Sequence, residues 1–166
     1  MKLRFPIEEV PYWAGRYSYP RTLNGALSSA VQTQRYFTKA QLVEICQWKS
    51  PRSAPKAERN DAVFVEEVTR AAIATTNEQF RVEGMTLLHG VGWPVASCLL
   101  HFGISGSYPI LDFRALWSLN VDVQPREYCF NLWQAYVAHC QVLAEQADVS
   151  VRELDKALWQ YSKEKS

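Results

Sequence analysis

The stretch from Met85 to Leu119 constrains the fold of this chain more than any other part of the sequence. It begins with a short apolar segment that leads into a tight turn, His89-Gly90-Val91-Gly92. Pro94 follows at the start of an apolar run, and proline is favoured in the first helical turn, where its missing N–H would have no partner. The stretch therefore predicts two helices joined by a glycine turn. Backbone N–H groups at such a turn, beside a helix N-terminus, favour binding of a phosphate.

A lone acid, Asp112, is the second informative feature of the same stretch. It follows Pro109-Ile110-Leu111 and precedes Phe113 in an otherwise apolar run. Burying an unpaired charge is costly, so a carboxylate in this position needs a role. It either caps the short helix expected over residues 113–119, for which aspartate is well suited, or it takes part in chemistry. The two roles are compatible, because a capping side chain can still face a site.

The order of helix, Gly-Val-Gly turn, helix, loop and aspartate resembles the helix-hairpin-helix DNA glycosylase superfamily, which includes endonuclease III-like and alkyl-adenine glycosylases. The hairpin of that family usually reads L-P-G-[VI]-G, and residues 88–92 follow this pattern except that His89 replaces the proline. The catalytic aspartate of the family follows an apolar run and precedes a helix, as Asp112 does. The step of eighteen positions from Pro94 to Asp112 equals the family's usual spacing from its Schiff-base lysine to its aspartate.

The resemblance implies a role for each of these residues. Gly90, Val91 and Gly92, together with His89, are expected to contact the backbone of double-stranded DNA, and nearby carbonyl oxygens to hold a monovalent cation. No other cofactor is implied. Asp112 is the implied catalytic carboxylate, which stabilises the positive charge that develops on the sugar and orients an attacking water.

Pro94 decides the type of activity that the resemblance implies. Bifunctional relatives attack the sugar with a lysine amine at this position and then nick the strand, and proline has no such amine. The expected activity is therefore that of a monofunctional glycosylase, which hydrolyses the bond between a damaged or modified base and its sugar and leaves an abasic site. A strand-cleaving step would need another lysine, for which Lys49 is a candidate.

Charge is distributed unevenly along the chain. The formal net charge is only +1, but residues 1–60 hold ten Lys/Arg against four Asp/Glu. An uneven distribution of this kind suits a protein with one side that faces a polyanion. Lys49 and Arg52 lie in this segment, beside Trp48 at the end of an expected helix, and either bind DNA phosphate or are ordinary solvated side chains around a core tryptophan.

Aromatic residues supply the candidates for a base pocket. An extruded base needs a stacking surface, and the candidates are Tyr12, Trp13, Trp48 and Tyr108. The alternative for each is ordinary packing in the core. Which base is recognised does not follow from these residues.

Several classes of protein are disfavoured by what the sequence lacks. The four cysteines are widely separated without C-x-x-C spacing, so they are expected to be buried free thiols, and the iron–sulfur cluster of endonuclease III-like relatives is not expected. No histidine lies at metal-ligand spacing, and no metal site is expected. No apolar run approaches the roughly 20 residues that span a bilayer, and the N-terminus has no signal-peptide pattern. A cytoplasmic protein without a membrane partner is expected.

Helical periodicity without period-two alternation predicts an all-α fold, a compact bundle over residues 1–166, as a single domain or as two lobes with a cleft. The helix-hairpin-helix motif would span about residues 77–102 and the candidate catalytic segment residues 108–119. Helices are expected over residues 22–37, 60–75 and 125–147, with a loop after Trp48. Capping boxes are expected to begin three helices, at Thr38–Gln41, Thr76–Gln79 and Ser150–Glu153.

Three functions remain open at this point. The first is a monofunctional DNA glycosylase. The second is a non-catalytic DNA-binding module, in which the turn holds phosphate and Asp112 only caps a helix. The third is a helical protein-interaction domain, in which the turn merely joins two helices.

Overall fold

The computed structural model describes residues 1–21, 23 and 25–166, and this part of the chain is entirely helical. It contains ten α-helices and three 3₁₀ turns and no β-strand, so the all-α prediction is confirmed. The chain, for which the sequence leaves open a single domain or two lobes, folds as two compact units. We call residues 21–105 the central unit, and residues 1–20 with residues 106–166 the terminal unit.

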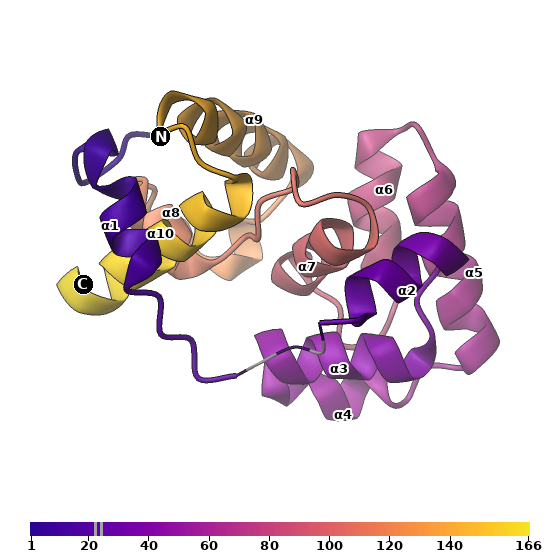
Figure 1. The fold of residues 1–166 in the computed structure, drawn as a ribbon. Helices are drawn as coiled ribbons and strands as arrows, with labels where there is room; N and C mark the ends of the chain where they lie inside the picture. Colours follow the sequence, from indigo (N-terminus) through magenta and orange to yellow (C-terminus); the bar gives the residue numbers. More distant parts are fainter. Residues whose placement is uncertain (22, 24) are drawn as a thin grey trace. The chain divides into compact units, whose positions relative to one another are not determined.

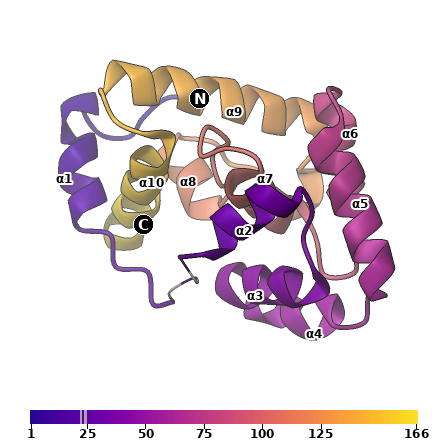
Figure 2. The same ribbon diagram turned by 45° about the vertical axis from the view of Figure 1, so that its right-hand side comes forward.

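The central unit is built around one apolar helix. It comprises α2 (Leu27–Gln34), α3 (Lys39–Lys49), the 3₁₀ turn η2 (Pro51–Ser53), α4 (Ala54–Ala57), α5 (Ala62–Ala74), α6 (Glu78–Met85) and α7 (Trp93–Gly103). Helix α7 lies against α2, α3 and α6 (Figure 1). Its residues from Val95 to His101, in the apolar run identified in the sequence, are all buried. Helices α5 and α6 follow one another along one side of the unit (Figure 2).

Local capping chemistry sets where these helices begin. Thr38 and Gln41 form the expected capping box at the start of α3. The box expected at Thr76–Gln79 is wrong, because Asn77 caps α6 instead and its side chain accepts a hydrogen bond from the Phe80 N–H (2.8 Å). The loop expected after Trp48 is also wrong over residues 51–57, where Pro51 and Pro55 occupy the first turns of η2 and α4. Thr22 and Asn24, in the helix expected over residues 22–37, lie outside the described residues, and α2 begins only at Leu27.

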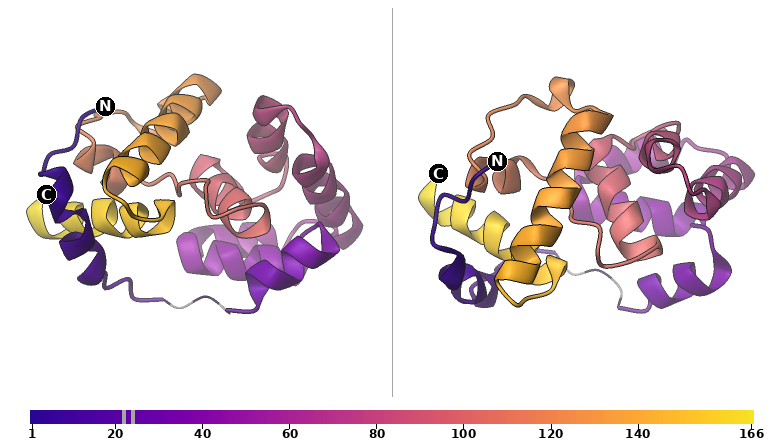
Figure 3. Two further views of the ribbon diagram at one scale, coloured as in Figure 1. Left: turned by 45° about the horizontal axis from the view of Figure 1, so that its top comes forward. Right: turned by 90° about the horizontal axis from the view of Figure 1, so that it is seen from above.

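The terminal unit combines both ends of the chain. It comprises η1 (Ile7–Glu9), α1 (Val10–Gly15), α8 (Phe113–Ser118), η3 (Pro125–Glu127), α9 (Phe130–Gln146) and α10 (Val151–Lys165). Helix α10 packs against α1, α8 and α9, and the two views of Figure 3 show α1 and α10 side by side. Ser150 and Glu153 form the expected capping box of α10. Helix expected over residues 125–147 is divided, since Tyr128 and Cys129 are extended between η3 and α9.

Aromatic packing fills the contact between α1 and α10. The ring of Trp13 lies 5.2 Å from that of Tyr161 and 6.3 Å from that of Phe5, both edge-on. Tyr17 and Tyr19 stack on each other and each meets Trp159 of α10 edge-on. The aromatic residues near the N-terminus therefore hold the first helix on the last one, which is the packing role that aromatic rings commonly have.

The cysteines are free thiols, as expected, and three of the four are buried. Cys46, Cys98 and Cys140 are buried and Cys129 is exposed. Burial raises the pKa of Cys46 to about 12 and that of Cys140 well above its usual range, so both thiols are protonated at neutral pH. Within the described residues, no group of three or more His, Cys, Asp or Glu side chains is arranged to hold a metal ion. No helix there is both long enough and apolar enough to cross a bilayer.

Candidate functional site

The glycine turn joins α6 to α7 and rests directly on a neighbouring helical segment. Gly90 has a positive φ of 84°, in the left-handed region that side chains rarely adopt. A Cβ atom on Gly90 would lie 2.6 Å from the carbonyl oxygen of Ser53 and 2.9 Å from the backbone nitrogen of Ala57. Only glycine fits here without moving backbone. The sequence therefore places glycine where the turn meets η2 and α4.

A buried asparagine fixes the backbone of the turn. The Asn60 side-chain amide donates to the carbonyl oxygen of His89 (3.0 Å) and to that of Ala57 (2.8 Å). Its carbonyl oxygen accepts a hydrogen bond from the His89 N–H (2.8 Å). The glycosylase family usually has proline at this position, and proline has no backbone N–H. The N–H that His89 has in its place is the one that donates to Asn60. The sequence analysis missed Asn60, because its role depends on the packing of segments 29 residues apart.

Two backbone donors of the turn have no hydrogen-bond partner among the described residues. The Val91 N–H donates to the carbonyl oxygen of Leu88 (3.1 Å) within the turn. The N–H groups of Gly90 and Gly92 make no hydrogen bond to any other described residue. Gly92 is exposed and caps the N-terminus of α7, whereas Gly90 is half-buried and Val91 is buried. The turn thus offers the donors that an anion at a helix N-terminus would use.

Basic residues lie on the segment that supports the turn. Arg52 is exposed on η2, and Lys49 is the last residue of α3. The Cβ atom of Lys56 lies 3.3 Å from where a Gly90 Cβ would be, and Arg59 adjoins Asn60. We call two segments that contact each other, the turn of residues 89–92 and the supporting residues 49–59 with their four cations, Lys49, Arg52, Lys56 and Arg59, the basic turn surface. The sequence analysis missed Lys56 and Arg59, although residues 49–59 hold four cations and one acid, Glu58.

Asp112 lies in the terminal unit and caps α8. Its carboxylate accepts a hydrogen bond from the Arg114 N–H (2.8 Å), and the side chain is half-buried. Its own carbonyl oxygen accepts the Leu116 N–H (2.9 Å), which is the first bond of the helix. The capping role expected for Asp112 is confirmed, and a chemical role stays a prediction.

Two buried polar side chains hold the segment that leads into Asp112. The Ile110 N–H donates to the carboxylate of Asp155 on α10 (3.0 Å), and the Tyr136 hydroxyl on α9 donates to the carbonyl oxygen of Ile110 (3.0 Å). Burial raises the pKa of Tyr136 well above its usual range, and the nearby Cys140, Asp155 and Asp112 add to the effect. The phenol therefore stays protonated and keeps donating. Sequence analysis missed both residues, because neither is near Asp112 in the chain.

The candidate base-pocket residues are mostly packed. Trp13 is 5% exposed and its indole N–H donates to Glu9 (2.9 Å), whereas its neighbour Tyr12 is 57% exposed. Tyr108 is half-buried and stacks on Trp133, with ring centroids 6.1 Å apart. Trp48 is buried in the central unit and forms one wall of an open pocket of about 570 Å³. Stacking of a base on any of the four stays a prediction.

The predicted site residues fall into two groups. The central unit brings the turn of residues 89–92 against η2, which carries Arg52, and it also contains Lys49 and Trp48. The terminal unit contains Asp112, Tyr12, Trp13 and Tyr108. Comparison with protein-family models, with curated proteins and with solved structures finds no match to this chain. The glycosylase resemblance therefore depends on the motif residues alone.

Proposed function

We propose that this chain binds the backbone of double-stranded DNA through the basic turn surface and acts as a monofunctional DNA glycosylase. The observation that carries the proposal is the turn itself. The N–H groups of Gly90 and Gly92 have no partner among the described residues, and Lys56 lies beside Gly90 on the supporting segment. Backbone N–H groups at a helix N-terminus bind phosphate without reading sequence, and nearby cations add a salt-dependent attraction.

The chemistry proposed for Asp112 follows from its carboxylate and its position. Cleavage of the bond between base and sugar develops positive charge on the sugar, which a fixed negative charge stabilises. The N–H of Arg114 and the anchored segment around Ile110 hold Asp112 in one place. A carboxylate so held can also orient an attacking water, and it need not reorganise during the reaction.

Pro94, in the first turn of α7, supports hydrolysis without strand cleavage. The reaction proposed adds one water across the base–sugar bond and releases the free base, leaving the phosphodiester backbone intact. A Schiff base would need a lysine amine at the reacting carbon, and the family position for that amine is occupied by proline.

The test of this proposal is a panel of duplexes carrying alkylated, deaminated or oxidised bases. We expect release of a base from at least one duplex, with strand breakage only after alkali, and no covalent adduct after borohydride treatment. Strand cleavage without alkali or a trapped adduct would overturn the monofunctional assignment and direct attention to Lys49. Absence of release from every lesion would overturn the glycosylase proposal.

DNA binding itself is expected to weaken steeply with salt. Each phosphate neutralised by a cation contributes a slope of about −0.9 in a plot of log affinity against log salt. We expect Lys49→Ala, and likewise Arg52→Ala, to lower the affinity for DNA by about the same factor whatever the DNA sequence. Each change should also reduce the size of the salt slope by about one. The matched control is Arg126→Ala, which removes an exposed cation of the terminal unit and should leave the affinity and the salt slope unchanged. An affinity that ignores ionic strength would favour the third function, a helical protein-interaction domain.

A non-catalytic DNA-binding module is the second candidate, and one observation favours it. The hydrogen bond from the Arg114 N–H to Asp112 explains why a carboxylate occupies this position even if it has no catalytic role, since aspartate is among the preferred helix caps. Salt-dependent binding without release of any base would make this the better assignment.

A further inference from the structure

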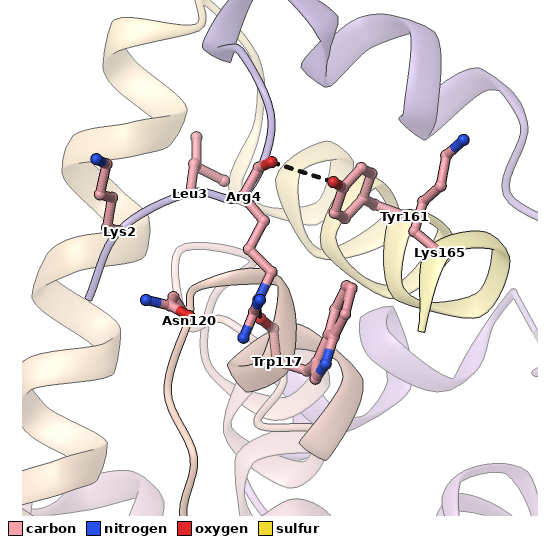
Figure 4. A pocket seen from close by; sticks show the side chains of 7 residues that line it. All are labelled: Lys2, Leu3, Arg4, Trp117, Asn120, Tyr161 and Lys165. Atoms are coloured by element: carbon pink, nitrogen blue, oxygen red, sulfur yellow. Dashed lines mark hydrogen bonds between the residues drawn. The ribbon is translucent and has the colours of Figure 1, made fainter.

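A pocket of the terminal unit is lined by cations and aromatic rings, and it shares no residue with the basic turn surface. It has a volume of about 510 Å³, within the range of small-molecule sites. Figure 4 shows Lys2 and Lys165 on opposite sides of Arg4, and the ring of Trp117 below Tyr161. No carboxylate lines the pocket; its polar and aromatic lining consists of Lys2, Arg4, Trp117, Asn120, Tyr161 and Lys165.

Arg4 is held in the pocket by four separate contacts. Its backbone N–H donates to the carbonyl oxygen of Ser118 (3.0 Å), and its backbone carbonyl oxygen accepts a hydrogen bond from the Tyr161 hydroxyl (3.1 Å). Its Nε donates to the carbonyl oxygen of Trp117 (2.5 Å), and its guanidinium lies 4.4 Å from the centroid of the Trp117 ring. The structure gives the terminal nitrogens of this guanidinium no hydrogen bond or ion pair with the described residues. Its two terminal nitrogens, which carry four N–H groups, are therefore oriented in advance with no acid to neutralise them.

The two lysines add positive charge to a pocket whose lining contains no carboxylate. Lys2 and Lys165 are exposed, and neither forms an ion pair with a described residue. The adjacent acid, Glu164, accepts hydrogen bonds from Arg16 (3.0 Å) and Gln160 (2.6 Å), which together with the nearby charge of Lys165 lower its pKa. Asn120, with a positive φ of 56°, adds a side-chain amide beside the guanidinium (Figure 4).

We propose that this pocket binds a nucleoside phosphate, either free or at the end of a nucleic-acid strand. A phosphate monoester carries a charge of about −1.5 to −2 at neutral pH and three acceptor oxygens, which suits one oriented guanidinium and two lysines better than a carboxylate does. The apolar part of the lining, for the uncharged part of the ligand, comes from Leu3, Trp117 and Tyr161. This inference does not depend on the proposed glycosylase function.

The test measures binding of adenosine 5′-monophosphate, adenosine and inorganic phosphate to the full chain by calorimetry, with the indole N–H resonance of Trp117 as a local reporter. We expect the monophosphate to bind and to shift this resonance, and adenosine to do neither. Arg4→Gln should weaken binding about tenfold or more, as expected when a charged donor is lost. Arg126→Gln, an equal change of charge elsewhere on the terminal unit, should not.

Because Arg4→Gln also removes a contact with Trp117, a second variant keeps the test decisive. Lys2→Gln with Lys165→Gln leaves Arg4 and Trp117 in place and should weaken binding comparably, with an unchanged melting temperature. An oligonucleotide with a 5′-phosphate, compared with its 5′-hydroxyl form, distinguishes a strand end from a free nucleotide as the source. Absence of binding by the monophosphate and the phosphorylated strand, or equal weakening by Arg126→Gln, would overturn the proposal. Neither result would bear on base release.

Discussion

Asp112→Asn is expected to abolish base release while leaving the fold and the affinity for DNA intact. Asparagine is nearly isosteric with aspartate and is an equally good helix cap, so the bond from the Arg114 N–H to residue 112 should persist. The negative charge that would meet the developing sugar cation is lost, however. Removal of one electrostatic stabiliser typically lowers the rate by about 10²-fold or more. Single-turnover base release, measured on the lesion found in the panel, gives the effect directly.

The control for this experiment is a second carboxylate that caps a helix without any proposed chemistry. Asp61 caps α5 through a hydrogen bond from the Phe64 N–H (3.0 Å) and is exposed. Asp61→Asn should leave base release unchanged. If Asp112→Asn releases base as fast as the unmodified chain, Asp112 is only a cap, and the catalytic carboxylate of this proposal does not exist.

Gly90→Ala is expected to be among the most destabilising single substitutions in the central unit. A left-handed backbone costs a residue other than glycine about 1–2 kcal/mol. The added methyl would also meet the carbonyl oxygen of Ser53 at 2.6 Å, so backbone must move, at a further cost of about 1–3 kcal/mol. A total of about 2–5 kcal/mol lowers the melting temperature by roughly 10 °C in a chain of this size. Thermal unfolding followed by circular dichroism measures it.

Gly92→Ala provides the matched comparison, because it separates stability from DNA contact. The nearest atom to an added Cβ is Cδ of Pro94, at 4.0 Å, and the φ of Gly92, −100°, suits alanine. Stability should change by no more than about 0.5 kcal/mol. If phosphate approaches the Gly92 N–H, the methyl on this exposed side should weaken DNA binding by roughly tenfold, which corresponds to about 1.4 kcal/mol. Equal affinity of the Gly92→Ala variant and the unmodified chain would show that DNA does not contact this turn.

The parts of the fold that the sequence predicted correctly are those determined by neighbouring residues. The capping boxes at Thr38 and Ser150 and the position of Pro94 in the first turn of α7 each depend on a few adjacent side chains. The failure at Thr76 has the same local origin, since Asn77 competes for the cap one residue later. The prolines after Trp48 predict a loop, but Pro51 and Pro55 each lie in the first turn of a helical segment.

The supports of the candidate site could not be predicted, because they depend on contacts between distant segments. Asn60 bonds to His89, and Asp155 bonds to Ile110 across 45 residues. No periodicity or motif marks such pairs in a single sequence. The sequence left open a single domain or two lobes, and it gave no boundary between them, since the basic residues of positions 1–60 are shared between the two units rather than gathered in one.

The order of the two units along the chain has a consequence for how the protein folds during synthesis. The central unit is one continuous segment, and its contacts can form as soon as residue 105 has left the ribosome. The first twenty residues, by contrast, must wait for partners such as Leu119, whose carbonyl oxygen receives the Lys2 N–H, and Tyr161, whose hydroxyl bonds to Arg4. Closing loops of more than 100 residues is slow compared with forming local helical contacts. The aromatic segment around Trp13 is consequently exposed to chaperones and to other chains until α10 has been made.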